Sequence, residues 1–232
     1  MGLLVASLGL GNPTRAELQY TITDLGSLDG THSEGLAINA SGQVTGSSST
    51  ANDVVHQSHA FITHSDGSMT DLGTLGGKSS AGNGINDSGQ VTGWASTAND
   101  RPSHAFTTNS AGKMIDWGSV GEIGDAINAS GQVTGMNDDS KAFIIQPNDG
   151  TMTVLGTLGG NWSHGLGINA SGHVTGMSLT ANGDTHAFTT HPSGVMTDLG
   201  TLSGGSGSVG KSINASGQIT GHATTKDGYP HA

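Results

Sequence analysis

The chain has 232 residues, of which 40 are glycine, 11% are charged and 4% are aromatic, and its formal net charge is −11. Seven Lys and Arg residues against 18 acidic ones argue against nucleic acid or an anionic membrane surface as a partner, because both require clustered positive charge. The sequence contains no cysteine, which excludes disulfides, thiolate chemistry and zinc sites with cysteine ligands.

Residues 1–16 differ in character from the rest of the chain. The apolar run 2–10 is too short to span a bilayer as a helix, and Thr14-Arg15-Ala16 suits signal-peptidase cleavage after Ala16. We interpret this segment as an export signal, with an N-terminal tail as the alternative. The mature chain, 17–232, is then a single repeat domain that does not insert into a membrane. We expect an extracellular or cell-surface location, or a periplasmic one.

From residue 20 onward the sequence is one repeat, copied with drift every 41–47 residues. Each copy holds three motifs, which are Ile-Asn-Ala/Asp-Ser-Gly, His-Ala-Phe and Asp-Leu-Gly. The approximate repeat units are 24–70, 71–115, 116–153, 154–197 and 198–232. The motifs or their variants begin at Ile38, Ile85, Ile127, Ile168 and Ile213; at His59, His104, Lys141, His186 and His231; and at Asp24, Asp71, Asp116, Val154 and Asp198. Such a period is typical of propeller blades or solenoid coils.

Each repeat unit predicts four short strands. The first strand ends in Gly-x-Ile-Asn, and the Ala-Ser-Gly that follows is a tight reversal with its glycine in the left-handed conformation. Gln-Val-Thr-Gly is the second strand, and a variable loop leads to His-Ala-Phe in the third, with His and Phe on one face. Met-Thr-Asp-Leu-Gly forms the fourth strand. We find no amphipathic helical pattern of useful length.

Four antiparallel strands in each of about five repeats predict an all-β fold. We expect a β-propeller of four-stranded antiparallel blades, five in number. Residues 20–26 match the fourth strand of the other repeats, and the last repeat stops inside its third strand, so we expect residues 20–26 to complete the last blade. An open β-solenoid, or one piece of a larger repeat array, is the alternative.

The three motifs in fixed order resemble the HAF-type extracellular repeat family of bacteria. The resemblance rests on residues such as 71–77 (Asp-Leu-Gly-Thr-Leu-Gly-Gly), 85–93 (Ile-Asn-Asp-Ser-Gly-Gln-Val-Thr-Gly) and 104–106 (His-Ala-Phe), and it covers 20–232. It implies exported, all-β proteins without assigned chemistry, some of them similar to autotransporter passengers. The third repeat departs from the pattern, because Lys141 replaces the histidine, so a role that needs His in every repeat is not expected.

Two motifs of catalytic or metal-binding type receive structural interpretations. Residues 205–212 match the phosphate-loop pattern, but a hairpin motif follows where the pattern requires a helix. The chain has no His-x-His and no His-Glu-x-x-His, so we expect neither a metal site nor a cofactor. We expect the recurrent histidines to be hydrogen-bond partners, for example of the recurrent aspartate, and the phenylalanines to fill the space between blades. These repeat positions are His59, His104, His186 and His231, and Phe61, Phe106, Phe143 and Phe188.

Acidic residues offer little support for an enzyme. A glycosidase needs two carboxyl groups that converge on the substrate, and only Glu34, Glu122 and Asp125 occupy positions that are not copied between repeats and lie near a first strand. A propeller enzyme of the glycoside hydrolase type is therefore the less favoured alternative. The Asx-rich loops could supply oxygen ligands to Ca²⁺, but solvated turns are the favoured interpretation.

These observations predict a non-catalytic binding or surface-structural module. The loops after the second and fourth strands share one face, and variable loops on a rigid scaffold commonly carry recognition. Carbohydrate is the expected ligand and another surface protein the alternative partner, while the competing hypothesis is a passenger or scaffold segment of a larger surface protein. The candidate ligand-binding residues are His56, Trp94, Arg101, Trp162 and Tyr229. For the two tryptophans, packing between blades is the alternative.

Overall fold

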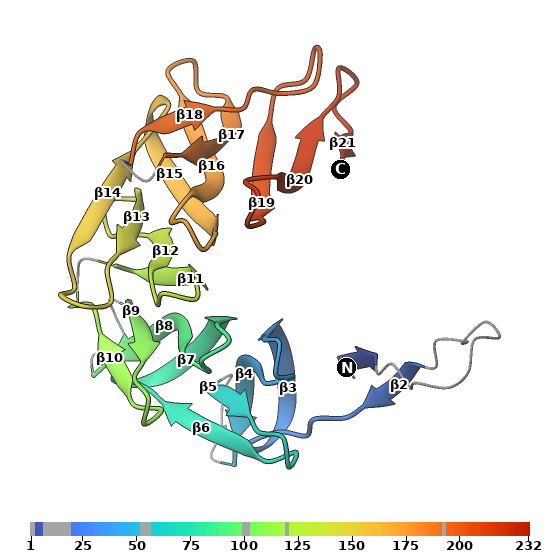
Figure 1. Ribbon diagram of the computed structural model, residues 1–232, viewed down its shortest axis with the longest axis vertical. Helices are drawn as coiled ribbons and strands as arrows, with labels where there is room; N and C mark the ends of the chain where they lie inside the picture. The colour runs from blue at the N-terminus through green and yellow to red at the C-terminus, as the bar shows by residue number, and fades with distance from the viewer. Residues whose placement is uncertain (1–2, 7–19, 52–56, 99–102, 119–120, 192–193) are drawn as a thin grey trace.

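The computed structural model describes residues 3–6, 20–51, 57–98, 103–118, 121–191 and 194–232. Within them the chain forms five antiparallel sheets that follow one another around an arc, with one edge of each sheet on the inner side of the arc (Figure 1). Four sheets have four strands and the fifth has three. This arrangement confirms the expected all-β propeller architecture with one sheet per sequence repeat.

The strands of each sheet are consecutive in the chain, and neighbours in the sequence are neighbours in the sheet. The first sheet holds β3 (Asp29–Ile38), β4 (Val44–Thr50), β5 (Ser58–Thr63) and β6 (Met69–Gly73). The second holds β7 (Gly76–Ile85), β8 (Val91–Thr97), β9 (Ser103–Thr108) and β10 (Met114–Asp116). The third holds β11 (Ile123–Ile127), β12 (Val133–Met136), β13 (Ala142–Ile145) and β14 (Met152–Gly156). The fourth holds β15 (Gly159–Ile168), β16 (Val174–Thr180), β17 (Thr185–Thr190) and β18 (Met196–Asp198), and the fifth holds β19 (Ser208–Ile213), β20 (Ile219–Thr224) and β21 (Pro230–His231).

The hairpin between the first and second strands follows directly from the Ile-Asn-x-Ser-Gly motif. In the first repeat, Asn39 N donates to Gln43 O at 3.0 Å and Gly42 N donates to Asn39 O at 3.0 Å. The side-chain Oδ1 of Asn39 accepts from Ser41 N and from Gln43 N. Gly42 has a φ of 78°, which an L-residue with a Cβ rarely adopts, so the motif requires glycine here.

The same asparagines join one sheet to the next. Asn39 Nδ2 donates to Asn86 O at 3.1 Å, and Asn86, Asn128 and Asn169 repeat this bond to the asparagine carbonyl of the following sheet. The bonds form a continuous row along the hairpin turns, which we call the asparagine ladder. Because four of the five asparagines are buried, the ladder satisfies polar groups that would otherwise be costly to bury.

Three of the recurrent phenylalanines, Phe106, Phe143 and Phe188, form the centre of the packing between sheets, as expected. Phe61, Phe106, Phe143 and Phe188 are each at most 1% exposed. Phe106 of the second sheet, for example, packs in one cluster with Ala60 and Ile62 of the first. The second, third and fourth sheets therefore each bury the third-strand phenylalanine against the alanine of the preceding third strand, and the apolar core consists of three clusters, one for each of the first three contacts between sheets.

A glycine in each inner strand sets how closely two sheets approach. A Cβ added at Gly82 of β7 would collide with Thr45 Oγ1 of the first sheet, and Gly124, Gly165 and Gly210 meet the corresponding threonines of the sheets that precede them. The threonine hydroxyl also donates to the phenylalanine carbonyl of its own sheet, as in Thr45 to Phe61 O at 2.6 Å. The repeated approach of this threonine to the inner-strand glycine of the following sheet therefore supports close contact between neighbouring sheets.

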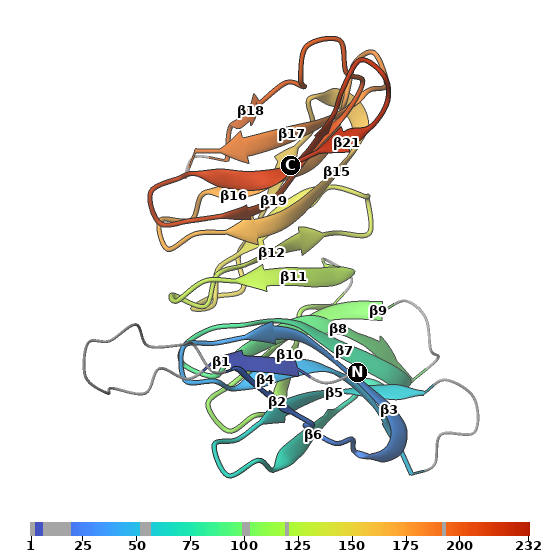
Figure 2. The same cartoon turned by 90° about the vertical axis from the view of Figure 1, so that its right-hand side faces the viewer.

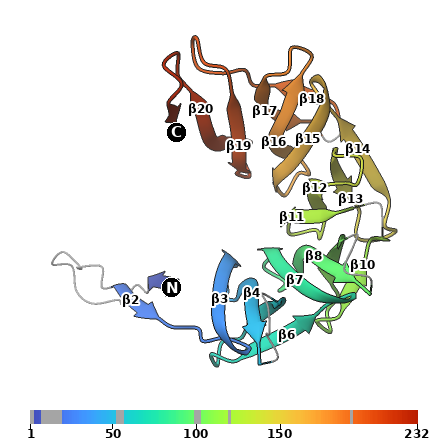
Figure 3. The ribbon, with the colours of Figure 1, turned by 180° about the vertical axis from the view of Figure 1, so that it is seen from behind.

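The arc does not close through residues 20–26, which corrects the expectation drawn from the sequence. The strand β2 (Tyr20–Thr23) pairs with β1 (Leu3–Ala6), and the fifth sheet ends with β21. In the described structure β21 pairs with β20 and is the last strand of its sheet. Figures 2 and 3 show the first and fifth sheets on opposite sides of the opening in the arc.

The N-terminal segment contributes β1 within the range interpreted as an export signal, and residues 1–2 and 7–16 lie outside the described part of the chain. Among the residues that are described, no helix is sufficiently long and apolar to cross a membrane.

Candidate functional site

The recurrent histidines are engaged in bonds within their own sheets. His59 Nδ1 lies 2.8 Å from Asp71 Oδ2, and His104 and His186 make the same contact with Asp116 and Asp198. The aspartate also accepts from the backbone two residues later, as in Gly73 N to Asp71 Oδ1 at 2.7 Å. The pair therefore joins the third strand to the end of the fourth strand, so the histidine has a structural role.

The electrostatics of this pair are clearest at Asp198. Partial burial raises the pKa of its carboxyl group, but the hydrogen bonds from Gly200 N and from His186 outweigh it and hold the pKa below the usual aspartate value. In the third sheet Lys141 takes the histidine position, and its Nζ donates instead to the carbonyl oxygens of Asp139 and Asn161. The bond to Asn161 reaches the fourth sheet, so the lysine joins two sheets where the histidine joins two strands.

The inner strands carry the positions that vary between repeats. Each one has a β-bulge at the same place, where one extra residue interrupts the register with the second strand, as between Gly35 and Ala37 in β3. A bulge redirects the side chain of the extra residue and is common beside functional sites. The extra residues are Leu36, Asn83, Asp125, Leu166 and Lys211.

Two of the bulged side chains reach the following sheet. Asn83 Nδ2 donates to Gly124 O at 3.1 Å. Asp125 of β11 lies with its Oδ2 2.6 Å from His164 Nε2 of β15, and the side chains of His164 and Asp125 are 15% and 22% exposed. The indole of Trp162 meets the imidazole of His164 edge-on, with ring centroids 6.2 Å apart. We call Asp125, His164 and Trp162 the inner-edge cluster.

The inner-edge cluster combines chemical groups that suit polyhydroxylated ligands. A carboxylate accepts hydrogen bonds, an imidazole donates or accepts, and an indole adds a flat apolar surface. None of the three residues recurs at the corresponding position of another repeat, in contrast to the His-Asp pairs. The arrangement therefore has the mixture of apolar surface and a few convergent polar groups that is common in small-molecule sites.

The five residues suggested by the sequence are not brought together. His56 and Arg101 lie outside the described residues. Trp94 is half-buried in β8 of the second sheet, Trp162 is half-buried in β15 of the fourth, and Tyr229 is 69% exposed in the turn before β21. Only Trp162 belongs to the inner-edge cluster.

The carboxylates that the sequence distinguished occupy separate places. Glu34 lines a cavity of about 550 Å³ on the free side of the first sheet, together with Asp24, His32 and Phe61. Glu122 takes the position of a serine that elsewhere accepts a hydrogen bond from the third-strand alanine N–H of the preceding sheet. At the contact of the second and third sheets, the Gly121 carbonyl accepts this bond from Ala105 N instead, at 2.7 Å. Asp125 is the only one of the three bonded to a side chain of a neighbouring sheet in the described structure.

Sequence reasoning missed His164. The signal was present in the alignment of the inner strands, where Glu34, Ala81, Ile123, His164 and Val209 occupy one position in otherwise similar repeats. The phosphate-loop match at 205–212 leads into the strand β19, so the helix that the pattern requires does not follow it. Among the described residues, no three His, Asp or Glu side chains are grouped closely enough to hold a metal ion.

The loop face predicted from strand order is supported by a recurring bridge. Leu28, Leu75 and Leu158, each just before an inner strand, bridge in parallel to Thr50, Thr97 and Thr180 near the ends of the second strands. The connections that follow the second and fourth strands therefore reach the same face. Trp162 lies near the start of β15 and so at this end of the inner edge.

Comparison with known proteins identifies the fold. No family model matches the sequence, and no curated protein matches it. Among solved structures, TolB from Acinetobacter baumannii matches with a TM-score of 0.50 at 11% identity, over 77% of this chain and 44% of that one. A protein provisionally assigned as a gluconolactonase matches with a TM-score of 0.41 at 16% identity, over 74% of this chain and 68% of that one. This chain thus spans less than half the length of the TolB chain, and at this identity the likeness to TolB supports the β-propeller fold alone.

Proposed function

We propose that this chain is an exported, non-catalytic binding module that holds a carbohydrate ligand at the inner-edge cluster. One observation carries the proposal: Asp125, His164 and Trp162 are not copied between repeats, yet they come from two neighbouring sheets, and Asp125 and Trp162 both contact His164. The copied polar side chains, by contrast, are occupied by bonds within the scaffold, such as the His-Asp pairs and the asparagine ladder.

The geometry suits a sugar in two respects. The indole of Trp162 can lie against the C–H groups of a pyranose ring, while Asp125 and His164 exchange hydrogen bonds with its hydroxyl groups. The two polar side chains are each less than a quarter exposed, so a ligand can reach them while bulk water competes weakly for the same bonds. Export is supported by the N-terminal segment and by the resemblance of the repeats to extracellular bacterial proteins.

The absence of catalysis is part of the proposal. Glycoside hydrolysis needs an acid and a base or nucleophile on opposite sides of the scissile bond. The Asp125 carboxylate is paired with an imidazole, and Glu34 belongs to the first sheet, two sheets away. The cluster is therefore better suited to holding a ligand than to cleaving it.

A glycan array followed by titration calorimetry tests the proposal. We expect saturable binding that Trp162→Ala weakens at least about tenfold, because a central aromatic contact contributes more than about 1 kcal/mol. Asp125→Asn should weaken it by a smaller factor, since an amide keeps one acceptor. Tyr229→Ala is the matched control, an exposed aromatic residue outside the cluster.

Three outcomes would contradict the proposal. Loss of binding on Tyr229→Ala but not on Trp162→Ala would assign recognition to the loops. Release of reducing sugar from a bound glycan would make the protein an enzyme. An array without binding would favour a passenger or scaffold segment, or another surface protein as the partner.

A further inference from the structure

The free sides of the first and fifth sheets carry complementary groups, of the kinds that bond to one another elsewhere in the arc. Between successive sheets the structure repeats the asparagine bond and the threonine–glycine contact four times and the serine bond three times, and within three sheets the third-strand histidine pairs with the fourth-strand aspartate. Each sheet therefore presents one set of groups to the sheet before it and another to the sheet after it. The first sheet has groups for a preceding sheet, and the fifth has groups for a following sheet. Four of these groups on each side match in kind and position.

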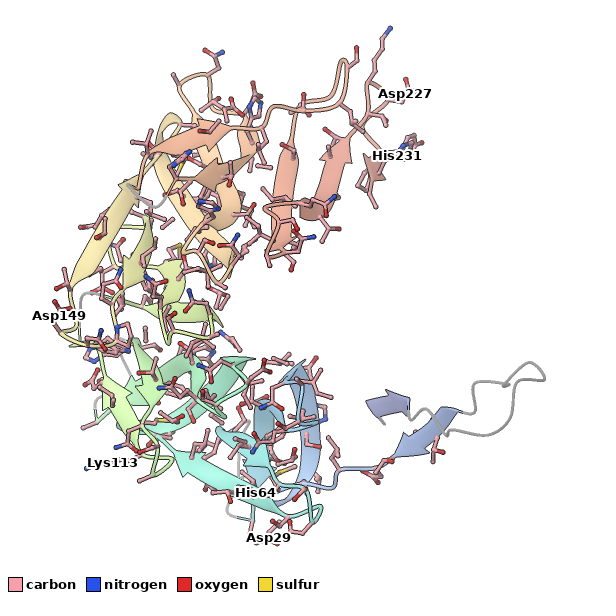
Figure 4. The ribbon with its side chains drawn as sticks, in the orientation of Figure 1. Asp29, His64, Lys113, Asp149, Asp227 and His231 are labelled. Atoms are coloured by element: carbon pink, nitrogen blue, oxygen red, sulfur yellow. The ribbon has the colours of Figure 1, made fainter. Side chains whose placement is uncertain are left out.

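The first match is the histidine and the aspartate. His231 stands opposite Ala223 in the register of β21 with β20, as His59 stands opposite Ser48 and His104 opposite Ala95. No hydrogen bond to the imidazole of His231 is present in the described structure, and Figure 4 shows its side chain at the free side of the fifth sheet. Asp24 Oδ1 accepts a hydrogen bond from Gly26 N, as Asp71 Oδ1 does from Gly73 N. In the described structure no histidine pairs with Asp24, whereas His59 pairs with Asp71.

The second match is the serine that bonds to the preceding sheet. Ser80 Oγ donates to Gly73 O and accepts from Ala60 N, and Ser163 and Ser208 make the same two bonds. Ser33 Oγ donates to Gly26 O at 2.6 Å, so residues 24–26 already contact β3 as the end of a fourth strand contacts the next sheet. Ser80 Oγ accepts from Ala60 N, directly after His59. The corresponding donor for Ser33 Oγ is the N–H of Ala232, directly after His231.

The third and fourth matches are the asparagine ladder and the Thr-Gly contact. Asn214 Nδ2 bonds to Gln218 Oε1 but to no carbonyl of another sheet in the described structure, while Asn39 O lies at the other end of the ladder. Thr220 is exposed at the position of Thr45. Gly35 meets no threonine, in contrast to the four corresponding glycines.

From these matches we propose that the fifth sheet of one molecule packs against the first sheet of a second copy of this chain. The asparagine bond and the threonine–glycine contact would be made as they are between the sheets of one chain, and residues 24–26 of the second copy would stand beside His231 as the end of a fourth strand stands beside the third-strand histidine. His231 would bond to Asp24, Ala232 N to Ser33 Oγ and Asn214 Nδ2 to Asn39 O, each pair coming from two molecules. The two sheets lie on opposite sides of the opening in the arc, which is why a second copy is the occupant and closure within one chain is not.

The contact is heterologous, because it joins two different surfaces. Each molecule added to an assembly presents another free fifth sheet and another free first sheet. Heterologous contacts lead to rings where the rotation closes and to open chains where it does not. The mass of the assembly should therefore rise steadily with protein concentration.

Light scattering after size-exclusion chromatography tests the proposal on the full chain. Across concentrations from about 1 to about 200 µM, a range that resolves micromolar association, we expect the mean mass to rise above the 23.1 kDa of one chain. Thr220→Arg should keep the chain at the mass of a monomer, because the long charged side chain occupies the contact with Gly35. Thr197→Arg is the matched control, an exposed threonine on the outer strand β18, and should assemble like the parent.

Disulfide trapping identifies the contact, and the chain contributes no cysteine of its own. Asp24→Cys and His231→Cys are placed in separate chains of different tag mass and mixed under mild oxidation. We expect a disulfide between the two variants, and little in a mixture of His231→Cys with Asp149→Cys, which lies on an exposed turn of the third sheet. The double variant His59→Cys/Asp71→Cys gives the yield for the same two positions inside one sheet.

Three results would overturn the proposal. The first is a mass of one chain at every concentration. The second is an equal effect of the two arginine substitutions on the mass. The third is a disulfide formed within single molecules of Asp24→Cys/His231→Cys at low concentration, which would mean that the arc closes on itself.

Discussion

Phe106 lies at the centre of the contact between the first and second sheets, and its truncation gives the sharpest test of the packing. The side chain is fully buried and shares a cluster with Ala60, Ile62, Val91 and Ala95. Removing the ring in Phe106→Ala forfeits about 2 kcal/mol of transfer free energy. A void of roughly 80 Å³ adds about 2 kcal/mol at the cost per volume found for buried truncations. We expect the free energy of unfolding to fall by about 4 kcal/mol.

Urea denaturation followed by circular dichroism measures this loss. The matched control is Ile115→Ala on β10 of the same sheet, which is 41% exposed and should cost less than about 1 kcal/mol. Because repeats contact mainly their neighbours, the loss should fall on one contact between sheets and broaden the transition as well as shift it. A loss below about 1 kcal/mol for Phe106→Ala, or a loss equal to that of the control, would refute the assignment of this ring to the core between sheets.

Three further predictions address the turns, the ladder and the acid limit of stability. Gly89→Val should cost about 1–3 kcal/mol, because residue 89 has a φ of 75° in the hairpin, and an unchanged thermal midpoint would contradict the turn assignment. Asn128→Ala should destabilise the chain by about 1–3 kcal/mol and more than Asn214→Ala, because Asn128 is buried and bonds to the next sheet while Asn214 is exposed; chemical denaturation that ranks them in the opposite order would argue against the ladder. Folding lowers the pKa of Asp198, so its contribution to stability is present above the pKa of an unfolded aspartate and is lost as the pH falls through the lower folded value. Asp198→Asn should therefore flatten the loss of stability below about pH 4, and identical pH profiles of the melting temperature would show that the carboxylate has no such role.

The strands and hairpins could be predicted because the same local sequence pattern recurs in each repeat. Ile-Asn-x-Ser-Gly specifies a turn through the Asn39 side chain and the positive φ of Gly42, and both act within five residues. The alternation in His-Ala-Phe placed His and Phe on one face of the third strand, and Phe61 is buried, as is Ala60 on the other face. Information that lies within a few residues of the sequence was sufficient for these elements.

Contacts between sheets were harder to predict, because they join residues about one repeat apart. Asp125 and His164 are 39 residues apart and meet only because a bulge redirects Asp125 toward the next sheet. No sequence motif marks that bulge beyond a glycine that is common throughout the chain. The failure of residues 20–26 to close the arc has a similar origin, since the separation of the first and fifth sheets depends on the angle between sheets summed over five repeats.

The asparagine ladder also determines which side chains a modifying enzyme can reach. Every asparagine of the ladder begins an Asn-x-Ser sequence, the acceptor signal for N-linked sugars, and attachment occurs at the side-chain nitrogen. In the folded chain that nitrogen is buried and already donates to the next sheet at Asn39, Asn86, Asn128 and Asn169. Asn161 and Asn214 are exposed, so a glycosylating host should modify these two once the chain has folded. Modification of the other four during synthesis would cut the row of bonds between sheets, so the order of folding and glycosylation would decide whether the arc forms.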